Sequence, residues 1–75
     1  MSHQDATPAQ QYLWCLSSVD LINAIVADDT DHYEPADCVD RNVQHLQLMV
    51  AKDFWTNEDM TPLMSAITAG LAYGS

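Results

Sequence analysis

Basic residues are nearly missing from this chain: two Lys and Arg stand against eleven Asp and Glu in 75 residues, which gives a formal net charge of −9. A small body of this charge repels anions, so direct binding of nucleic acid or of an acidic membrane surface is disfavoured and basic partners are favoured. No apolar run approaches the roughly 18 to 20 residues that cross a bilayer. The first residues also lack the basic flank and apolar centre of a signal peptide, so we expect a cytoplasmic protein.

Cysteine is equally rare, with two residues, Cys15 and Cys38. Because no export signal precedes them, both are expected to stay reduced and to pack as small apolar side chains, and one disulfide between them is the alternative. Hydrophobic residues make up 48% of the chain, which argues against disorder despite the charge. A chain this short forms one domain and buries only about 60% of the surface that its unfolded form exposes.

Helical spacing of apolar residues occurs three times, each time after a start signal. In the first signal, the side chains of Thr7 and Gln10 can each accept the other's backbone N–H, and Pro8 suits the first turn. Pro35 opens the second helix. A Thr-Asn-Glu-Asp turn precedes the third, for which Thr61-Pro62 is another possible start after a short preliminary turn. The predicted helices cover residues 8–27, 35–54 and 58–72 of a single domain, 7–73, which follows a flexible N-terminal arm of residues 1–6.

One face of each helix is predicted to point inward. Short connections between consecutive helices then predict a small all-α antiparallel three-helix bundle. Small residues at Ala66, Ala69 and Gly70 should let another element approach the third helix closely. The inward faces hold Tyr12, Leu16, Val19, Ile22 and Val26 in the first helix, Val39, Val43, Leu46, Val50 and Phe54 in the second, and Met60, Leu63, Met64, Ile67 and Leu71 in the third.

The first helix carries a second apolar row, formed by Trp14, Leu21 and Ile25. With it, the helix is apolar around more than half of its circumference, which is wider than a surface helix requires. This row is the candidate interface, and homodimerisation through it could complete a four-helix arrangement. The alternative is a monomer in which Trp14 and Ile25 pack beneath the third helix.

Carboxylates gather where the first helix passes into the second. They form a candidate acidic docking surface for a basic protein partner, and a solvated connection with carboxylates near a helix N-terminus is the simpler interpretation. Their spacing also partly matches a calcium loop of the EF-hand kind, but Glu34 fills its glycine position and Asp40 replaces its bidentate Glu, so calcium is not expected. The residues of this candidate surface are Asp28, Asp29, Asp31, Glu34, Asp37 and Asp40.

Histidine and cysteine supply the ligand types of a transition-metal site without its spacing. Cys38 and His45 share a helix face but stand seven residues apart, roughly 10 Å along the axis, and His3 and His32 show no paired spacing. No arrangement of nucleophile, base and oxyanion site is apparent. We therefore expect no metal, no cofactor and no catalytic residue, and thus no enzymatic activity.

Three stretches between residues 40 and 70 carry a further signal: Arg41-Asn42-Val43-Gln44-His45-Leu46-Gln47-Leu48-Met49, Phe54-Trp55-Thr56-Asn57-Glu58-Asp59-Met60-Thr61-Pro62 and Ala66-Ile67-Thr68-Ala69-Gly70. Together they resemble small helical proteins encoded by bacteriophages and prophages. Such proteins include virion-assembly accessories and inhibitors of host machinery. The resemblance implies an origin and carries no catalytic or binding residue.

These observations predict a non-enzymatic protein–protein interaction module, a phage or prophage accessory protein that binds a host or phage protein in the host-cell cytoplasm. One alternative is an acidic mimic of nucleic acid that inhibits a host DNA-binding protein, for which capture of basic proteins should be sensitive to salt. The other is a structural or assembly factor of the virion, which should be recovered with purified particles.

Overall fold

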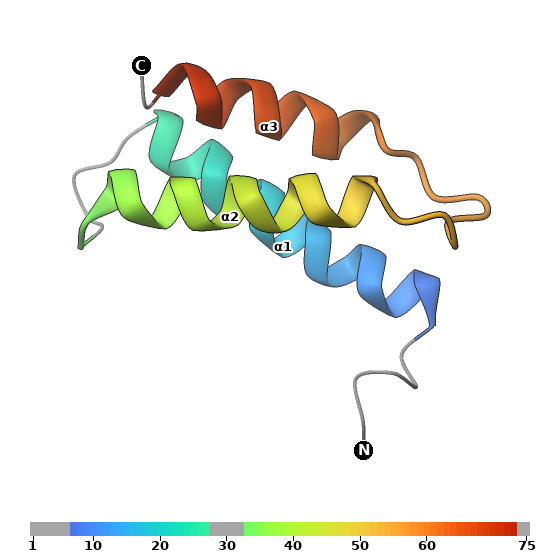
Figure 1. Cartoon of the computed structure of the whole chain (residues 1–75). Coiled ribbons are helices and arrows are strands. Elements are labelled where there is room, and N and C mark those ends of the chain that lie inside the picture. The colour runs from blue at the N-terminus through green and yellow to red at the C-terminus, as the bar shows by residue number, and fades with distance from the viewer. Residues whose placement is uncertain (1–6, 28–32, 74–75) are drawn as a thin grey trace.

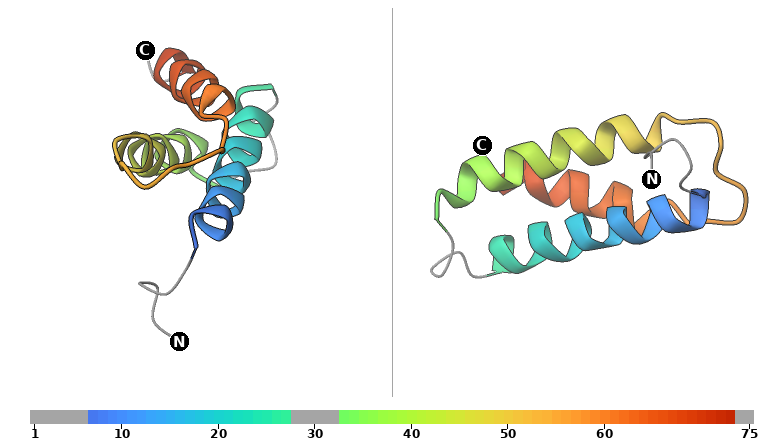
Figure 2. Two further views of the ribbon diagram at one scale, coloured as in Figure 1. Left: turned by 90° about the vertical axis from the view of Figure 1, so that its right-hand side faces the viewer. Right: turned by 90° about the horizontal axis from the view of Figure 1, so that it is seen from below.

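The computed structural model describes residues 7–27 and 33–73, so the predicted arm of residues 1–6 lies outside the described residues. Three helices follow one another: α1 (Pro8–Ala27), α2 (Pro35–Val50) and α3 (Thr61–Tyr73). The helices α1 and α3 run in one direction and α2 in the other (Figure 1), and every pair of helices is in contact. Viewed end-on, the helices occupy the corners of a triangle (Figure 2, left). The predicted all-α three-helix bundle is confirmed.

The first helix begins as its sequence predicts. The backbone N–H of Thr7 donates to Gln10 Oε1 at 3.0 Å, and the N–H of Gln10 donates to Thr7 Oγ1 at 3.1 Å. This reciprocal pair satisfies two amides that have no partner within the helix, which is why the helix starts at Pro8. In the part of the chain that the structure describes, no helix combines the length and the hydropathy needed to cross a membrane.

The second helix ends at Val50, four residues before the predicted boundary. In a continued α-helix the carbonyl of Met49 would accept the N–H of Asp53. That carbonyl instead accepts the N–H of Lys52 at 3.1 Å and the indole Nε1–H of Trp55 at 2.9 Å. A side chain from the following segment thus takes the place of the next helical hydrogen bond.

The third helix begins at Thr61, the alternative start that the sequence offers, and not at residue 58. The Asp59 carboxylate accepts the N–H of Thr61 at 2.9 Å, while the Glu58 carboxylate accepts the N–H of Thr56 at 3.0 Å. Both acidic side chains are therefore used in the turn before the helix, and each satisfies an amide that the helix cannot.

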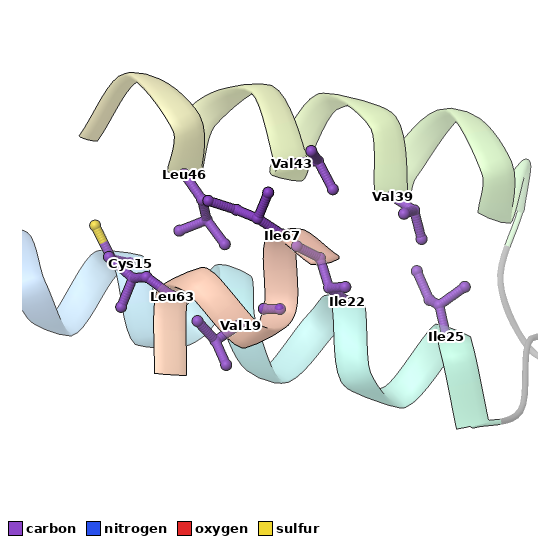
Figure 3. Packing of buried hydrophobic residues seen from close by; sticks show 10 residues of the cluster. Cys15, Val19, Ile22, Ile25, Val39, Val43, Leu46, Leu63 and Ile67 are labelled. Atoms are coloured by element: carbon purple, nitrogen blue, oxygen red, sulfur yellow. The ribbon is translucent and has the colours of Figure 1, made fainter. Parts of the chain in front are cut away.

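The core lies along the common axis of the three helices (Figure 3). The predicted inner face of α2 is confirmed at Val39, Val43 and Leu46, which are buried, and Val50 packs half-buried against the core. The prediction is wrong for Phe54, which lies beyond the end of the helix. The inner face of α1 is rotated from the predicted one: Ile25 is fully buried, whereas Val26 remains 39% exposed. The buried hydrophobic residues are Cys15, Val19, Ile22, Ile25, Val39, Val43, Leu46, Leu63, Ala66 and Ile67.

The inner face of α3 is also rotated, toward small residues. Met64 and Leu71, which were predicted to face inward, are 53% and 55% exposed, and Ala66 and Gly70 are buried instead. A Cβ placed on Gly70 would collide with the side chain of Val43. The absence of that carbon lets α3 sit directly on α2, and this close approach decides which side of α3 faces the core.

Candidate functional site

The three residues predicted to form an interface separate in the folded chain. Trp14 is 49% exposed, Leu21 is half-buried against the core, and Ile25 is completely buried. Ile25 points toward Val39 of α2 (Figure 3), so the prediction that it contacts a partner is wrong. In the monomeric alternative, Trp14 and Ile25 pack beneath α3; Ile25 is covered within the chain, as this alternative requires, whereas Trp14 remains 49% exposed.

Four residues of α1 form one flank of this helix: Trp14, Ser18, Leu21 and Ile25, spaced by four, three and four residues. Such spacing keeps them in one row along the helix. Ile25 shows that the row faces α2. On the opposite flank, Tyr12 reaches the segment that leads into α3, where its hydroxyl donates to the carbonyl of Asp59 at 2.6 Å. The row of Trp14 therefore borders α2, away from α3.

A matching row, which was not predicted as a surface from the sequence, follows one flank of α2. It holds Cys38, Asn42, His45 and Met49, again spaced by four, three and four residues. Among the buried residues of α2, Val43 lies nearest to Gly70 of α3. Because Val43 is on the edge of the buried row away from Cys38, the flank of Cys38 faces α1. His45 is exposed, and the other three residues are half-buried. The sequence contains this row as a second set of residues at helical spacing, each one position before Val39, Val43, Leu46 and Val50.

The two rows together form what we call the α1–α2 face: Trp14, Ser18, Leu21 and Ile25 with Cys38, Asn42, His45 and Met49. Figure 2 (right) looks onto α1 and α2 with α3 behind them, which is the side on which this face lies. Because the helices are antiparallel and Ile25 lies opposite Val39, the register places Trp14 level with Met49 and Ser18 level with His45. The open part of the face is thus near the start of α1 and the end of α2.

Charge is distributed unevenly around the bundle. Between Pro8 and Ala27 the single charged residue is Asp20, which shares a row with Leu16 and Asn23 on the flank opposite Trp14. The helix α3 has no charged residue. The remaining described charges belong to α2 and the connecting segments, so no position of the α1–α2 face carries a carboxylate, ammonium or guanidinium group.

The candidate acidic docking surface is described only in part, because Asp28, Asp29 and Asp31 lie outside the described residues. Glu34, Asp37 and Asp40 are all exposed. Two of these carboxylates have partners on their own helix, since Asp37 Oδ2 lies 3.3 Å from Arg41 Nε and Asp40 Oδ2 accepts the Gln44 amide at 3.0 Å. These contacts are the i, i+4 pairs of a solvated helix surface.

Groups of side chains that could hold a metal ion do not occur within residues 7–27 and 33–73. Both described cysteines are free thiols; Cys15 lies in the core and Cys38 is half-buried. Burial raises the pKa of the Cys15 thiol. His45 is exposed, and the two other histidines, His3 and His32, lie outside the described residues. The expectation that both cysteines pack as small apolar side chains is confirmed.

Aromatic side chains hold the start of α1 in place on the flank opposite the α1–α2 face. The ring of Trp55 meets Tyr12 edge-on with centroids 6.2 Å apart, and Phe54 packs against Trp55 at 4.7 Å. Such pairs add to the burial of their ring surfaces. They fix the first turns of α1 against the segment between α2 and α3, and Trp14 follows Tyr12 by two residues, so its position on the bundle is set by the same contacts.

Comparison of the chain with protein-family models, with curated proteins and with solved structures found no match. The surface chemistry of the described residues therefore carries the functional argument.

Proposed function

We propose that this chain is a non-enzymatic protein–protein interaction module and that the α1–α2 face is its binding surface. One observation carries the proposal: Trp14 is 49% exposed in a row of helical spacing that borders a second, matching row. Large aromatic side chains that remain half-open are the residues that contribute most to protein interfaces when a partner covers them. The surrounding positions are apolar or neutral, which lowers the desolvation cost of covering them.

The charge pattern supports a division of roles between surfaces. A net charge of −9 keeps the chain soluble and repels anions, while the uncharged α1–α2 face can approach another protein without burying a carboxylate. The resemblance of residues 40–70 to phage and prophage proteins makes a phage or host protein the expected target. An acidic mimic of nucleic acid would instead make its contacts through the carboxylates of α2 and the connecting segments.

Site-specific photo-crosslinking in cells that produce the chain tests the proposal. A photoreactive amino acid is introduced at His45, which is exposed on the α1–α2 face, and in a matched control at Gln47, which is exposed on the opposite flank of the same helix. We expect covalent protein adducts from position 45 and few from position 47. Adducts from both positions alike, or from neither, would contradict the proposed surface.

A further inference from the structure

We infer that the α1–α2 face binds a second copy of this chain, an inference that rests on the proposed function and names its partner. The geometry of the face is the first argument. Two antiparallel helices turned by half a rotation again present two antiparallel helices, so one such face can pack on another about a two-fold axis. The α1 and α2 helices of both copies would then form a four-helix layer, with each α3 on the outside.

Matching rows of side chains give the second argument. The rows that begin at Trp14 and Cys38 have the same spacing of four, three and four residues. Each lies directly beside a buried row, formed by Cys15, Val19 and Ile22 in α1 and by Val39, Val43 and Leu46 in α2. The same spacing leads on to Val26, which is exposed, and to Val50, which is half-buried. A helix that carries two adjacent rows of this kind can pack on two neighbours at once. Within one chain, the rows that begin at Trp14 and at Cys38 are only partly covered by other residues.

The charges around the α1–α2 face permit contact with a second copy and disfavour a basic partner there. Two chains of net charge −9 repel one another at long range, so their contact has to be made where carboxylates are missing. The α1–α2 face meets that condition, because Asp20 lies on the other flank of α1 and Asp40 lies five residues from His45, on the α3 side of α2. A basic partner drawn by the net charge would find no carboxylate on this face to pair with.

The size of the face predicts a weak dimer. The shorter of the two helices, α2, has 16 residues and is therefore roughly 24 Å long, and two packed helices are roughly 20 Å wide. Because the Ile25 end of the face is already covered within the chain, the face covers at most about 500 Å² in each copy, or about 1,000 Å² in the pair, which is the lower limit for a specific interface. We expect a reversible dimer that dissociates on dilution in the micromolar range.

Sedimentation equilibrium across a dilution series, at about 20 mM and about 300 mM NaCl, tests the inference on the full chain. Salt screens the repulsion between the two acidic copies, so the dimer dissociation constant should fall several-fold at the higher salt concentration. The dissociation constant of a dimer held by contacts between opposite charges would instead rise with salt. A dissociation constant that rises with salt, or a monomer at all concentrations and both salt conditions, overturns the inference.

Two matched variants locate the interface. His45→Glu places one carboxylate of each copy on the α1–α2 face and should raise the dissociation constant at least about tenfold, because like charges would be buried together. Gln47→Glu adds the same charge to the same helix outside the face and should change it less than about twofold. Trp14→Ala should weaken the dimer as His45→Glu does, and circular dichroism shows that each variant keeps its helices. Equal effects of the two glutamate variants would overturn the assignment.

Failure of this inference is distinguishable from failure of the proposed function. A chain that stays monomeric in sedimentation yet forms adducts with a different protein from position 45 retains the interaction surface and loses the second copy as its occupant. Adducts of twice the chain mass from position 45 support both proposals together.

Discussion

The hydroxyl of Tyr12 donates a hydrogen bond of 2.6 Å to the backbone carbonyl of Asp59, 47 residues further along the chain. This bond joins the second turn of α1 to the turn that begins α3. The same turn contains the two carboxylates, of Glu58 and Asp59, that accept backbone amides. One end of the bundle is therefore fastened by contacts between elements that are remote in sequence, and the buried side chains continue from there toward the other end.

Removing the Tyr12 hydroxyl should loosen this end of the bundle. We expect Tyr12→Phe to lower the free energy of unfolding by about 1 kcal/mol, since the ring contact with Trp55 is kept and one hydrogen bond near the surface is lost. Tyr33→Phe is the matched control, because Tyr33 is 90% exposed. Urea denaturation of both variants measures the difference. An equal change in both would show that the Tyr12–Asp59 bond adds no stability.

An added methyl group at position 70 should destabilise the chain. Helix propensity alone would favour Gly70→Ala by about 1 kcal/mol, but the new Cβ would collide with Val43 and lie 3.2 Å from Val39 Cγ1. We expect a net loss of about 1 to 3 kcal/mol from this overpacking. Thermal unfolding of Gly70→Ala, Val43→Ala and the double variant forms a cycle in which the double variant should lose less than the sum of the single losses. If the losses of the two single variants simply added, the destabilisation by Gly70→Ala would not come from contact with Val43.

Truncation of buried side chains should have large effects, as the helix faces imply. Leu46 is completely buried and Ile67 is 8% exposed. We expect Leu46→Ala and Ile67→Ala each to lower the free energy of unfolding by about 2 to 5 kcal/mol. Leu48→Ala, two residues from Leu46 and 68% exposed, should change it by less than about 0.5 kcal/mol. Urea denaturation measures all three variants. If Leu46→Ala had the same free energy of unfolding as the parent chain, the assignment of Leu46 to the inner face of α2 would be wrong.

Acid should destabilise the turn before α3. The N–H of Thr56 lowers the pKa of Glu58, and that of Thr61 lowers the pKa of Asp59, below their ordinary values of 4.5 and 3.8. Because each carboxyl has its lower pKa in the folded chain, the stability it adds is complete above its unfolded pKa and is lost as pH falls through its folded pKa. Combining Glu58→Gln with Asp59→Asn should therefore flatten the pH dependence of the unfolding free energy below about pH 5. Urea denaturation at stepped pH measures this slope, and an unchanged slope would assign the acid response to other carboxyls.

The two thiols should differ in reactivity toward iodoacetamide. Cys15 is completely buried, and its raised pKa reduces the thiolate that reacts. Cys38 is half-buried at the edge of the α1–α2 face. Mass spectrometry after brief alkylation of the native chain should find the label on Cys38 first, with Cys15 labelled only after unfolding. Early labelling of Cys15 would show that this part of the core opens readily.

The sequence by itself determined the number of helices and most of their boundaries. The reciprocal bonds of Thr7 and Gln10 are local, so the start of α1 could be predicted without knowledge of any other element. The inner face of α2 was equally predictable, because Val39, Val43, Leu46 and Val50 form one apolar row at helical spacing in a helix whose other positions are mostly polar. Local hydrogen bonds are sufficient to predict the start of α1, and the contrast between apolar and polar faces is sufficient to predict the inner face of α2.

Tertiary structure decided the features that depend on contacts between helices. The helices α1 and α3 are apolar on several sides, so their spacing could not say which side is covered; Ile25 was assigned to an interface and lies in the core, while Met64 was assigned to the core and lies outside. The close approach of Gly70 to Val43 turns α3, and the indole of Trp55 ends α2 at Val50 by binding the carbonyl of Met49. The α1–α2 face follows from the same contacts, because two rows on separate helices become one surface only when the helices are packed side by side.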